Sequence, residues 1–125
     1  MEETFGPHIT LDLKGCPKDI LSNYQLHFDY LKNIPKLIEM TPITQPYVFP
    51  YEGLVPEDKG ITGIVIIAES HISVHSFEEK GYCFIDIFSC KPFDYDKAVR
   101  LTKDIFRPED WEINVVRSEE RRVGK

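Results

Sequence analysis

The sequence predicts a two-layer α/β sandwich, in which an antiparallel β-sheet is covered on one face by two helices. Segments where apolar and polar residues alternate occur near both ends and in the middle of the chain. Segments with an apolar residue every three or four positions separate them. The order is therefore strand, helix, strands, helix, strand. A chain of 125 residues suits a single domain with one core.

The first half of the chain begins with an alternating strand, HITLDLK, over residues 8–14, which Gly15 and Pro17 terminate. A helix is expected from Asp19 onward, with a break near Pro35. Its apolar positions are Ile20, Tyr24, Phe28, Leu31, Ile34 and Ile38. The proline-rich segment that follows has room for one short edge strand, Tyr47–Phe49. An acidic loop, EGLVPEDKG, comes next.

The second half opens with GITGIVIIAES, an apolar, β-branched stretch that predicts a buried strand. HISVHSF and YCFIDIF are separated by EEKG and predict a β-hairpin. Asp94–Phe106 carries apolar residues at helical spacing, with Asp94 placed to cap the helix. Trp111–Val116 closes the sheet as the last strand.

A four-residue hairpin loop fixes the register, because Phe77 then lies opposite Tyr82. One face of the hairpin is apolar and is expected to pack against the helices: Ile72, Val74, Cys83, Ile85 and Ile87. The other face mixes polar and aromatic side chains: His71, Ser73, His75, Tyr82, Phe84, Asp86 and Phe88. Such a mixture favours an interface or a functional site over a simple solvent face.

The same register places Cys90 beside the bond between Glu69 and Ser70. His75 is five residues from Ser70 along an extended strand, or roughly 16 Å. It cannot reach that bond within one strand. If His75 acts on Ser70, it acts on the Ser70 of a second subunit, which predicts a homodimer with paired sites.

The segment GITGIVIIAESHISVHSFEEKGYCFIDIFSC resembles the core of the prokaryotic S-adenosylmethionine decarboxylase proenzymes, and the resemblance extends over about residues 8–116. It implies that the chain cuts itself between Glu69 and Ser70, giving a β chain (1–69) and an α chain from 70. Ser70 would become a pyruvoyl group, so neither pyridoxal phosphate nor a metal is expected. The substrate amine would form a Schiff base with it. The product would be the aminopropyl donor for spermidine.

The resemblance also assigns roles to individual residues. His75 matches the histidine that supplies acid–base catalysis during cleavage. Thr62 occupies the position of the family's processing serine and keeps the hydroxyl. Cys90 matches the proton donor of decarboxylation, since its thiol is ordinarily protonated at neutral pH.

Two further residues match the family's substrate-binding positions. Glu79 matches the acidic residue that accepts hydrogen bonds from the ribose hydroxyls. Phe49 is the candidate for the ring that stacks on adenine, with Tyr47 and Tyr51 as alternatives because the loop after them is longer than in shorter family members.

Two other functions compete with this one. The same small fold serves pyruvoyl-dependent arginine or ornithine decarboxylases, and the altered loop at 50–60 is where such a change of substrate would lie. A non-enzymatic dimerisation module is the third possibility. Glu69, Ser70, His75 and Cys90 all remain, which speaks against lost chemistry.

Four further polar residues receive a weaker interpretation or none. His71 either positions the cut bond or is a hydrogen-bonded strand histidine. Asp86, opposite Ser73, is expected to be a hydrogen-bond partner at an interface. His8 and His27 are given no role.

Composition excludes several classes of partner. The net charge of −6 argues against nucleic acid, and no apolar run approaches the ~20 residues that span a membrane. A cytoplasmic protein is expected. Three cysteines without CxxC spacing predict neither a disulfide framework nor a metal site. The ending RSEERRVGK resembles a translated sequencing adapter. Arg117–Lys125 is therefore expected to be a non-native tail, which leaves residues 1–116 as the domain.

Overall fold

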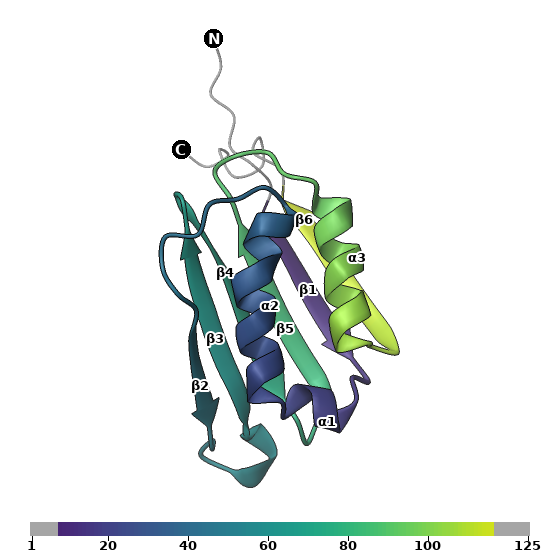
Figure 1. Ribbon diagram of the computed structural model, residues 1–125. Coiled ribbons are helices and arrows are strands. Elements are labelled where there is room, and N and C mark those ends of the chain that lie inside the picture. The colour runs from purple at the N-terminus through teal and green to yellow at the C-terminus, as the bar shows by residue number, and fades with distance from the viewer. Residues whose placement is uncertain (1–7, 117–125) are drawn as a thin grey trace, which may run out of the picture.

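A computed structural model describes residues 8–116, in which six strands form one antiparallel sheet of order β2-β3-β4-β5-β1-β6 (Figure 1). The tail predicted at Arg117–Lys125 lies outside the described residues. The strands are β1 (His8–Lys14), β2 (Tyr47–Tyr51), β3 (Gly60–Ile67), β4 (Ser70–Phe77), β5 (Tyr82–Phe88) and β6 (Asp110–Val116). The helices are α1 (Lys18–Leu21), α2 (Tyr24–Leu37), the 3₁₀ turn η1 (Pro56–Asp58) and α3 (Tyr95–Phe106).

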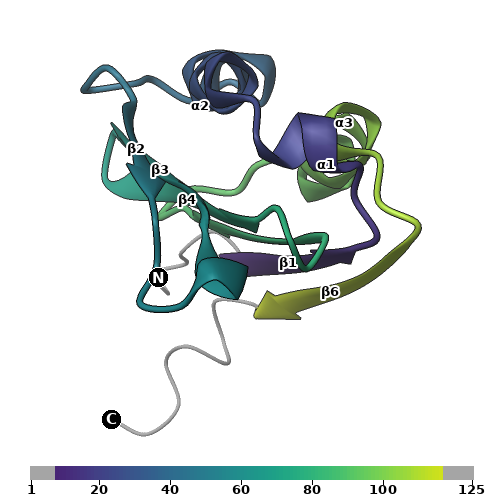
Figure 2. The same ribbon diagram turned by 90° about the horizontal axis from the view of Figure 1, so that it is seen from below.

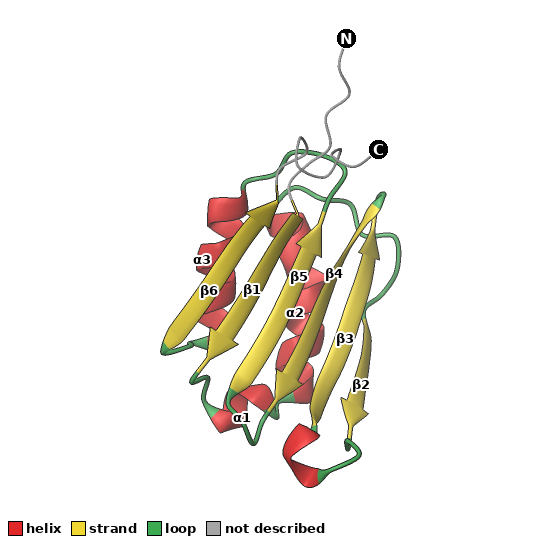
Figure 3. Cartoon of the chain, turned by 180° about the vertical axis from the view of Figure 1, so that it is seen from behind, coloured by secondary structure: helices red, strands yellow, loops and turns green. Residues whose placement is uncertain are grey.

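The helices α1, α2 and α3 lie on the same side of the sheet (Figure 2). Seen from the other side, the strands are in front and no described helix covers them (Figure 3). We call these two sides the covered face and the open face. The predicted two-layer sandwich is confirmed.

The core lies between the helices and the covered face. Alternate residues of each central strand point into it, and the burial pattern of β4 and β5 changes at every residue. The core is almost wholly apolar, so its burial is the main source of stability. Its largest fully buried side chains include Phe106, Ile9, Leu11, Leu13, Leu21, Leu31, Ile34, Ile67, Ile72, Ile85 and Ile87.

The predicted hairpin register is confirmed from Phe77–Tyr82 through His71–Phe88. The five apolar residues assigned to the helix side are all buried: Ile72, Val74, Cys83, Ile85 and Ile87. Asp94 caps α3, because its side chain accepts a hydrogen bond from the backbone N–H of Lys97 at 3.1 Å.

The first helical segment differs from the prediction. Its interruption lies at Ser22 and Asn23, where the Asn23 side chain accepts a hydrogen bond from Leu26 N and starts a new helix. Pro35 is inside α2, two residues before its end, so the helix is not broken there as predicted. The edge strand β2 reaches Tyr51, and it tolerates Pro50 because an edge strand has one unpaired side.

Candidate active site

The turn between β3 and β4 places a serine hydroxyl against the preceding peptide bond. Ser70 begins β4, and its Oγ donates a hydrogen bond to the Glu69 carbonyl oxygen at 2.6 Å. Glu69 adopts a φ of 62°, in the left-handed region that non-glycine residues rarely occupy. Such a conformation stores about 1–3 kcal/mol. The Glu69–Ser70 bond is therefore strained and has a nucleophile beside it.

Cys90 lies next to this bond, as the hairpin register predicted. Its backbone N–H donates a hydrogen bond to Ser70 Oγ at 3.0 Å. The neighbouring Ser89 is buried, and its Oγ contacts both the N–H and the C=O of Lys91 at 2.9 and 2.7 Å. This local turn fixes the position of Cys90 after β5 ends.

The three cysteines have different environments. Burial raises the pKa of the Cys16 thiol to about 11, and it also raises the pKa of Cys83. Both are core side chains. Cys90 is only partly buried, and its backbone N–H contacts the Ser70 hydroxyl beside the strained bond.

His75 and Thr62 are cross-strand partners on the open face. The Thr62 Oγ1 and His75 Nδ1 atoms are 3.3 Å apart. The same row of the sheet continues to Phe49 on β2 and to Phe84 on β5. The residue pair that the resemblance assigned to cleavage is therefore brought together, between two exposed aromatic residues of the same row.

Ser70 and His75 remain apart within the chain. Both belong to β4, which pairs with β3 along its whole length and is therefore extended. Five residues of strand separate them by roughly 16 Å. By the alternation of buried and exposed residues along β4, Ser70 belongs to the covered face and His75 to the open face.

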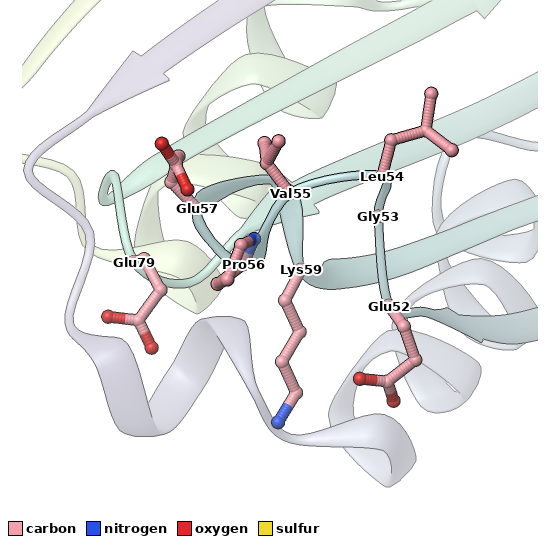
Figure 4. A pocket seen from close by; sticks show the side chains of 8 residues that line it. All are labelled: Glu52, Gly53, Leu54, Val55, Pro56, Glu57, Lys59 and Glu79. Atoms are coloured by element: carbon pink, nitrogen blue, oxygen red, sulfur yellow. The ribbon is translucent and has the colours of Figure 1, made fainter.

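Glu79 lines a cavity of about 590 Å³ between the hairpin turn and the loop after β2 (Figure 4). Its carboxylate also pairs with Lys18 Nζ at 3.0 Å. Phe49 lies instead on the open face, and Tyr51 is closer in register to the hairpin turn, because it pairs with Gly60 opposite Phe77. The cavity is lined by Glu52, Gly53, Leu54, Val55, Pro56, Glu57, Lys59 and Glu79.

Two polar clusters were not predicted, although the sequence analysis offered a hydrogen-bonding role for His71 and for Asp86. On the open face, Asp86 accepts hydrogen bonds from His71 and from His8. Under the helices, His27 contacts Ser76 Oγ at 2.5 Å. The hairpin register placed His71 and Asp86 near each other, but nothing local in the sequence showed that β1 would bring His8 beside them.

Within residues 8–116, no cluster of three His, Cys, Asp or Glu side chains has a geometry that could hold a metal ion. Over the same range, no helix has the length and apolar character needed to cross a bilayer.

Comparisons with known proteins agree on one family. A family model described as S-adenosylmethionine decarboxylase matches residues 7–119. The S-adenosylmethionine decarboxylase proenzyme of Thermococcus gammatolerans is 34% identical over 106 residues, covering 84% of this chain and 70% of the relative. The proenzyme of Clostridium botulinum strain Loch Maree is 36% identical over 100 residues, covering 79% of this chain and 81% of the relative. The crystal structure of the Aquifex aeolicus adenosylmethionine decarboxylase superposes with a TM-score of 0.74 at 26% identity, covering 92% of this chain and 91% of the other.

Proposed function

The chain belongs to the S-adenosylmethionine decarboxylase family, and from that premise we propose that it decarboxylates S-adenosylmethionine to the aminopropyl donor of spermidine synthesis. The observation that carries the proposal is the contact between Ser70, the strained Glu69 carbonyl and Cys90. The relatives reported above are named for S-adenosylmethionine, which favours that substrate over arginine or ornithine. Three free thiols suit the reducing cytoplasm, where we place the protein.

The proposal begins with cleavage of the proenzyme between Glu69 and Ser70. Ser70 Oγ attacks the Glu69 carbonyl carbon, and the acyl group moves from the amide nitrogen to the oxygen as an ester. A base then removes the Ser70 α-proton. The ester oxygen leaves as part of the Glu69 carboxylate, and residue 70 becomes dehydroalanine. Water replaces its nitrogen, which departs as ammonia, and a pyruvoyl group heads the α chain.

The fit of that group rests on the surroundings of Ser70. The serine side chain is 9% exposed, so there is little spare volume around it. Pyruvate adds no atoms beyond those the serine already places there, and it carries no charge that burial would penalise. When present, the group supplies an electron sink for decarboxylation.

Cys90 has the position required of a proton donor. It is held beside residue 70 by its own backbone N–H and by the Ser89 turn. We assign Cys90 Sγ the transfer of a proton to the carbon that lost CO2.

Substrate binding is assigned to Glu79 and Phe49. Glu79 lines the cavity together with Glu52 and Glu57, and carboxylates suit ribose hydroxyls and a sulfonium cation. Figure 4 shows Glu79 and Glu52 on opposite sides of Lys59. The Phe49 ring is 56% exposed and therefore available for stacking on adenine.

We further propose a homodimer in which His75 and Thr62 serve the Ser70 of the second subunit. Support comes from the separation of Ser70 and His75 along β4, which prevents contact within one chain. The open face also exposes more aromatic surface than solvent favours: Tyr47, Phe49, Tyr51, Tyr82 and Phe84. A second copy would cover these rings and complete the site.

Mass spectrometry of the purified protein tests the cleavage. We expect two chains separated before residue 70, with hydrazine or borohydride trapping a ketone on the α chain, which begins at residue 70. Ser70→Ala should give one chain with no ketone. Release of CO2 from carboxyl-labelled S-adenosylmethionine, with labelled arginine as control, tests the substrate. An intact wild-type chain with nothing trapped would contradict the proposal.

Co-expression of two inactive variants tests the shared site. Ser70→Ala lacks the nucleophile and His75→Ala lacks the base, so neither should cleave alone. In a mixed dimer, the Ser70 of the His75→Ala chain meets the intact His75 of its partner. Only the His75→Ala chain should then be cleaved. Cleavage of neither chain in a mixed dimer would show that His75 does not act across subunits.

A further inference from the structure

Asp86 joins two histidines from the neighbouring strands on the open face. His71 Nε2 donates a hydrogen bond to Asp86 Oδ2 at 3.0 Å, and His8 Nε2 donates one to Oδ1. Phe88 lies against both imidazoles, stacked on His71 at 5.7 Å between ring centres and edge-on to His8 at 5.3 Å. The three polar side chains are only about one-third exposed. They form a fixed group, which we call the Asp86 clamp.

The clamp connects the two products of the proposed cleavage. His8 belongs to the β chain, whereas Asp86 and His71 belong to the α chain, and His71 is the second residue after the cut bond. The clamp therefore connects the residue next to the new chain end to a strand of the other chain.

Cleavage removes two of the contacts that hold residue 70 in place. Before it, residue 70 is fixed by the peptide link to Glu69 and by the hydrogen bond from Cys90 N–H to Ser70 Oγ. In the chemistry proposed above, Oγ leaves with the Glu69 carboxylate, so both ties are lost together. The new chain end then depends on the β4 ladder and on His71. Strand ends held only by ladder hydrogen bonds fray readily.

We propose that Asp86 is a positioning residue, which holds the reactive end of the α chain beside Cys90 through His71. This inference rests on the proposed function, because the end exists only after cleavage. The hydrogen bonds of Asp86 go to His71 and His8, so it acts on residue 70 through another residue. A shift of the end by ~1 Å would cost up to ~100-fold in rate.

Hydrogen exchange measured by mass spectrometry tests the clamp. Asp86→Asn keeps the shape of the side chain and removes its charge. We expect cleavage and ketone content to match wild type, while the amides of residues 71–74 exchange at least ~5-fold faster. The same substitution in uncleaved Ser70→Ala should leave those amides unchanged, because Glu69 still holds the strand. Asp12→Asn removes a carboxylate from β1 on the same face and is the matched control. It should leave the exchange of residues 71–74 unchanged in both the cleaved and the uncleaved protein.

Kinetics separate positioning from binding. Asp86→Asn should lower kcat by about tenfold or more and leave KM within ~2-fold. His71→Phe retains the ring against Phe88 but loses Nε2, and it should reproduce the exchange result if the first variant folds poorly. If the wild-type protein never cleaves, the proposed function is wrong. If the wild-type protein cleaves but Asp86→Asn does not speed exchange at residues 71–74, the clamp alone is wrong. The clamp is also wrong if Asp86→Asn speeds that exchange equally in the uncleaved Ser70→Ala protein.

Discussion

Two histidine–hydroxyl pairs lie on opposite faces of the same sheet, supplied by adjacent residues of β4. On the open face, His75 Nδ1 is 3.3 Å from Thr62 Oγ1. On the covered face, Ser76 Oγ is 2.5 Å from His27 Nε2 and 3.6 Å from Cys83 Sγ. The covered pair has the closer contacts and a thiol beside it, so by composition it resembles a catalytic group more than the open pair does.

Access separates the two pairs. His27 has no exposed surface, and its Nδ1–H donates to the Asn23 carbonyl at 2.7 Å. That bond leaves Nε2 as the acceptor of the Ser76 hydroxyl, so the neutral ring is fully used inside the core. His75 is exposed, with one longer contact. The comparison shows that exposure, rather than residue type, separates the two pairs. We expect the exposed pair to be the one that acts in processing.

The largest expected effect is that of His75→Ala on cleavage. Removing an acid–base group should slow conversion to two chains by about 10²–10⁴-fold, while the exposed position leaves folding intact. The rate is measured from the time course of the two chains on denaturing gels. Cleavage at the wild-type rate would remove His75 from the processing machinery and leave the open pair without a function.

His27→Ala should have the opposite profile. It removes a buried ring that packs edge-on against Phe106 at 5.5 Å, together with the hydrogen bond to Ser76. We expect the free energy of unfolding to fall by about 2–4 kcal/mol. Urea titration in the uncleaved Ser70→Ala background measures it, with His75→Ala as the control that changes it little. The folded fraction should still cleave when Ser70 is restored.

Thr62→Val sharpens the comparison with a smaller change. It keeps the shape of a β-branched strand residue and removes the hydroxyl near His75. Cleavage should slow by about tenfold, the value of one hydrogen bond to a group that becomes charged. Thr62→Ser restores a hydroxyl and should cleave near the wild-type rate. Equal rates for Val and Ser would mean that the hydroxyl does not contribute.

Local sequence signals explain which contacts were predictable. The four-residue loop Glu78–Gly81 fixes the β4–β5 register, and that register alone places Cys90 beside Ser70. The family resemblance assigned Thr62 and His75 to the same cleavage step but did not predict their contact. That contact was available from the sequence, because a two-residue turn at Ala68 and Glu69 pairs Ile67 with Ser70 and hence Thr62 with His75.

Long-range pairing explains what was missed. His8 reaches Asp86 only because β1 inserts between β5 and β6, a placement that no local pattern specifies. His27 reaches Ser76 because α2 lies across the covered face. Its role was not predicted, because the apolar residues of the helix already explained why that side is buried. Both cases combine residues more than forty positions apart.

The smallest expected effect is a dependence of stability on pH that belongs to the covered pair. Burial lowers the pKa of His27 below its ordinary value of 6.5. As the pH falls below 6.5, the unfolded chain gains a proton that the folded chain refuses, so the free energy of unfolding decreases. The loss is at most ~1.4 kcal/mol per pH unit, and the stability is fully present above 6.5. Urea titrations of Ser70→Ala at several pH values, with and without His27→Gln, isolate this contribution from the other titrating groups. If the free energy of unfolding of the two proteins, with and without His27→Gln, changes in parallel from neutral to acidic pH, then His27 takes up its proton equally in the folded and unfolded states. The buried pair would then be no more closed to water than the open pair.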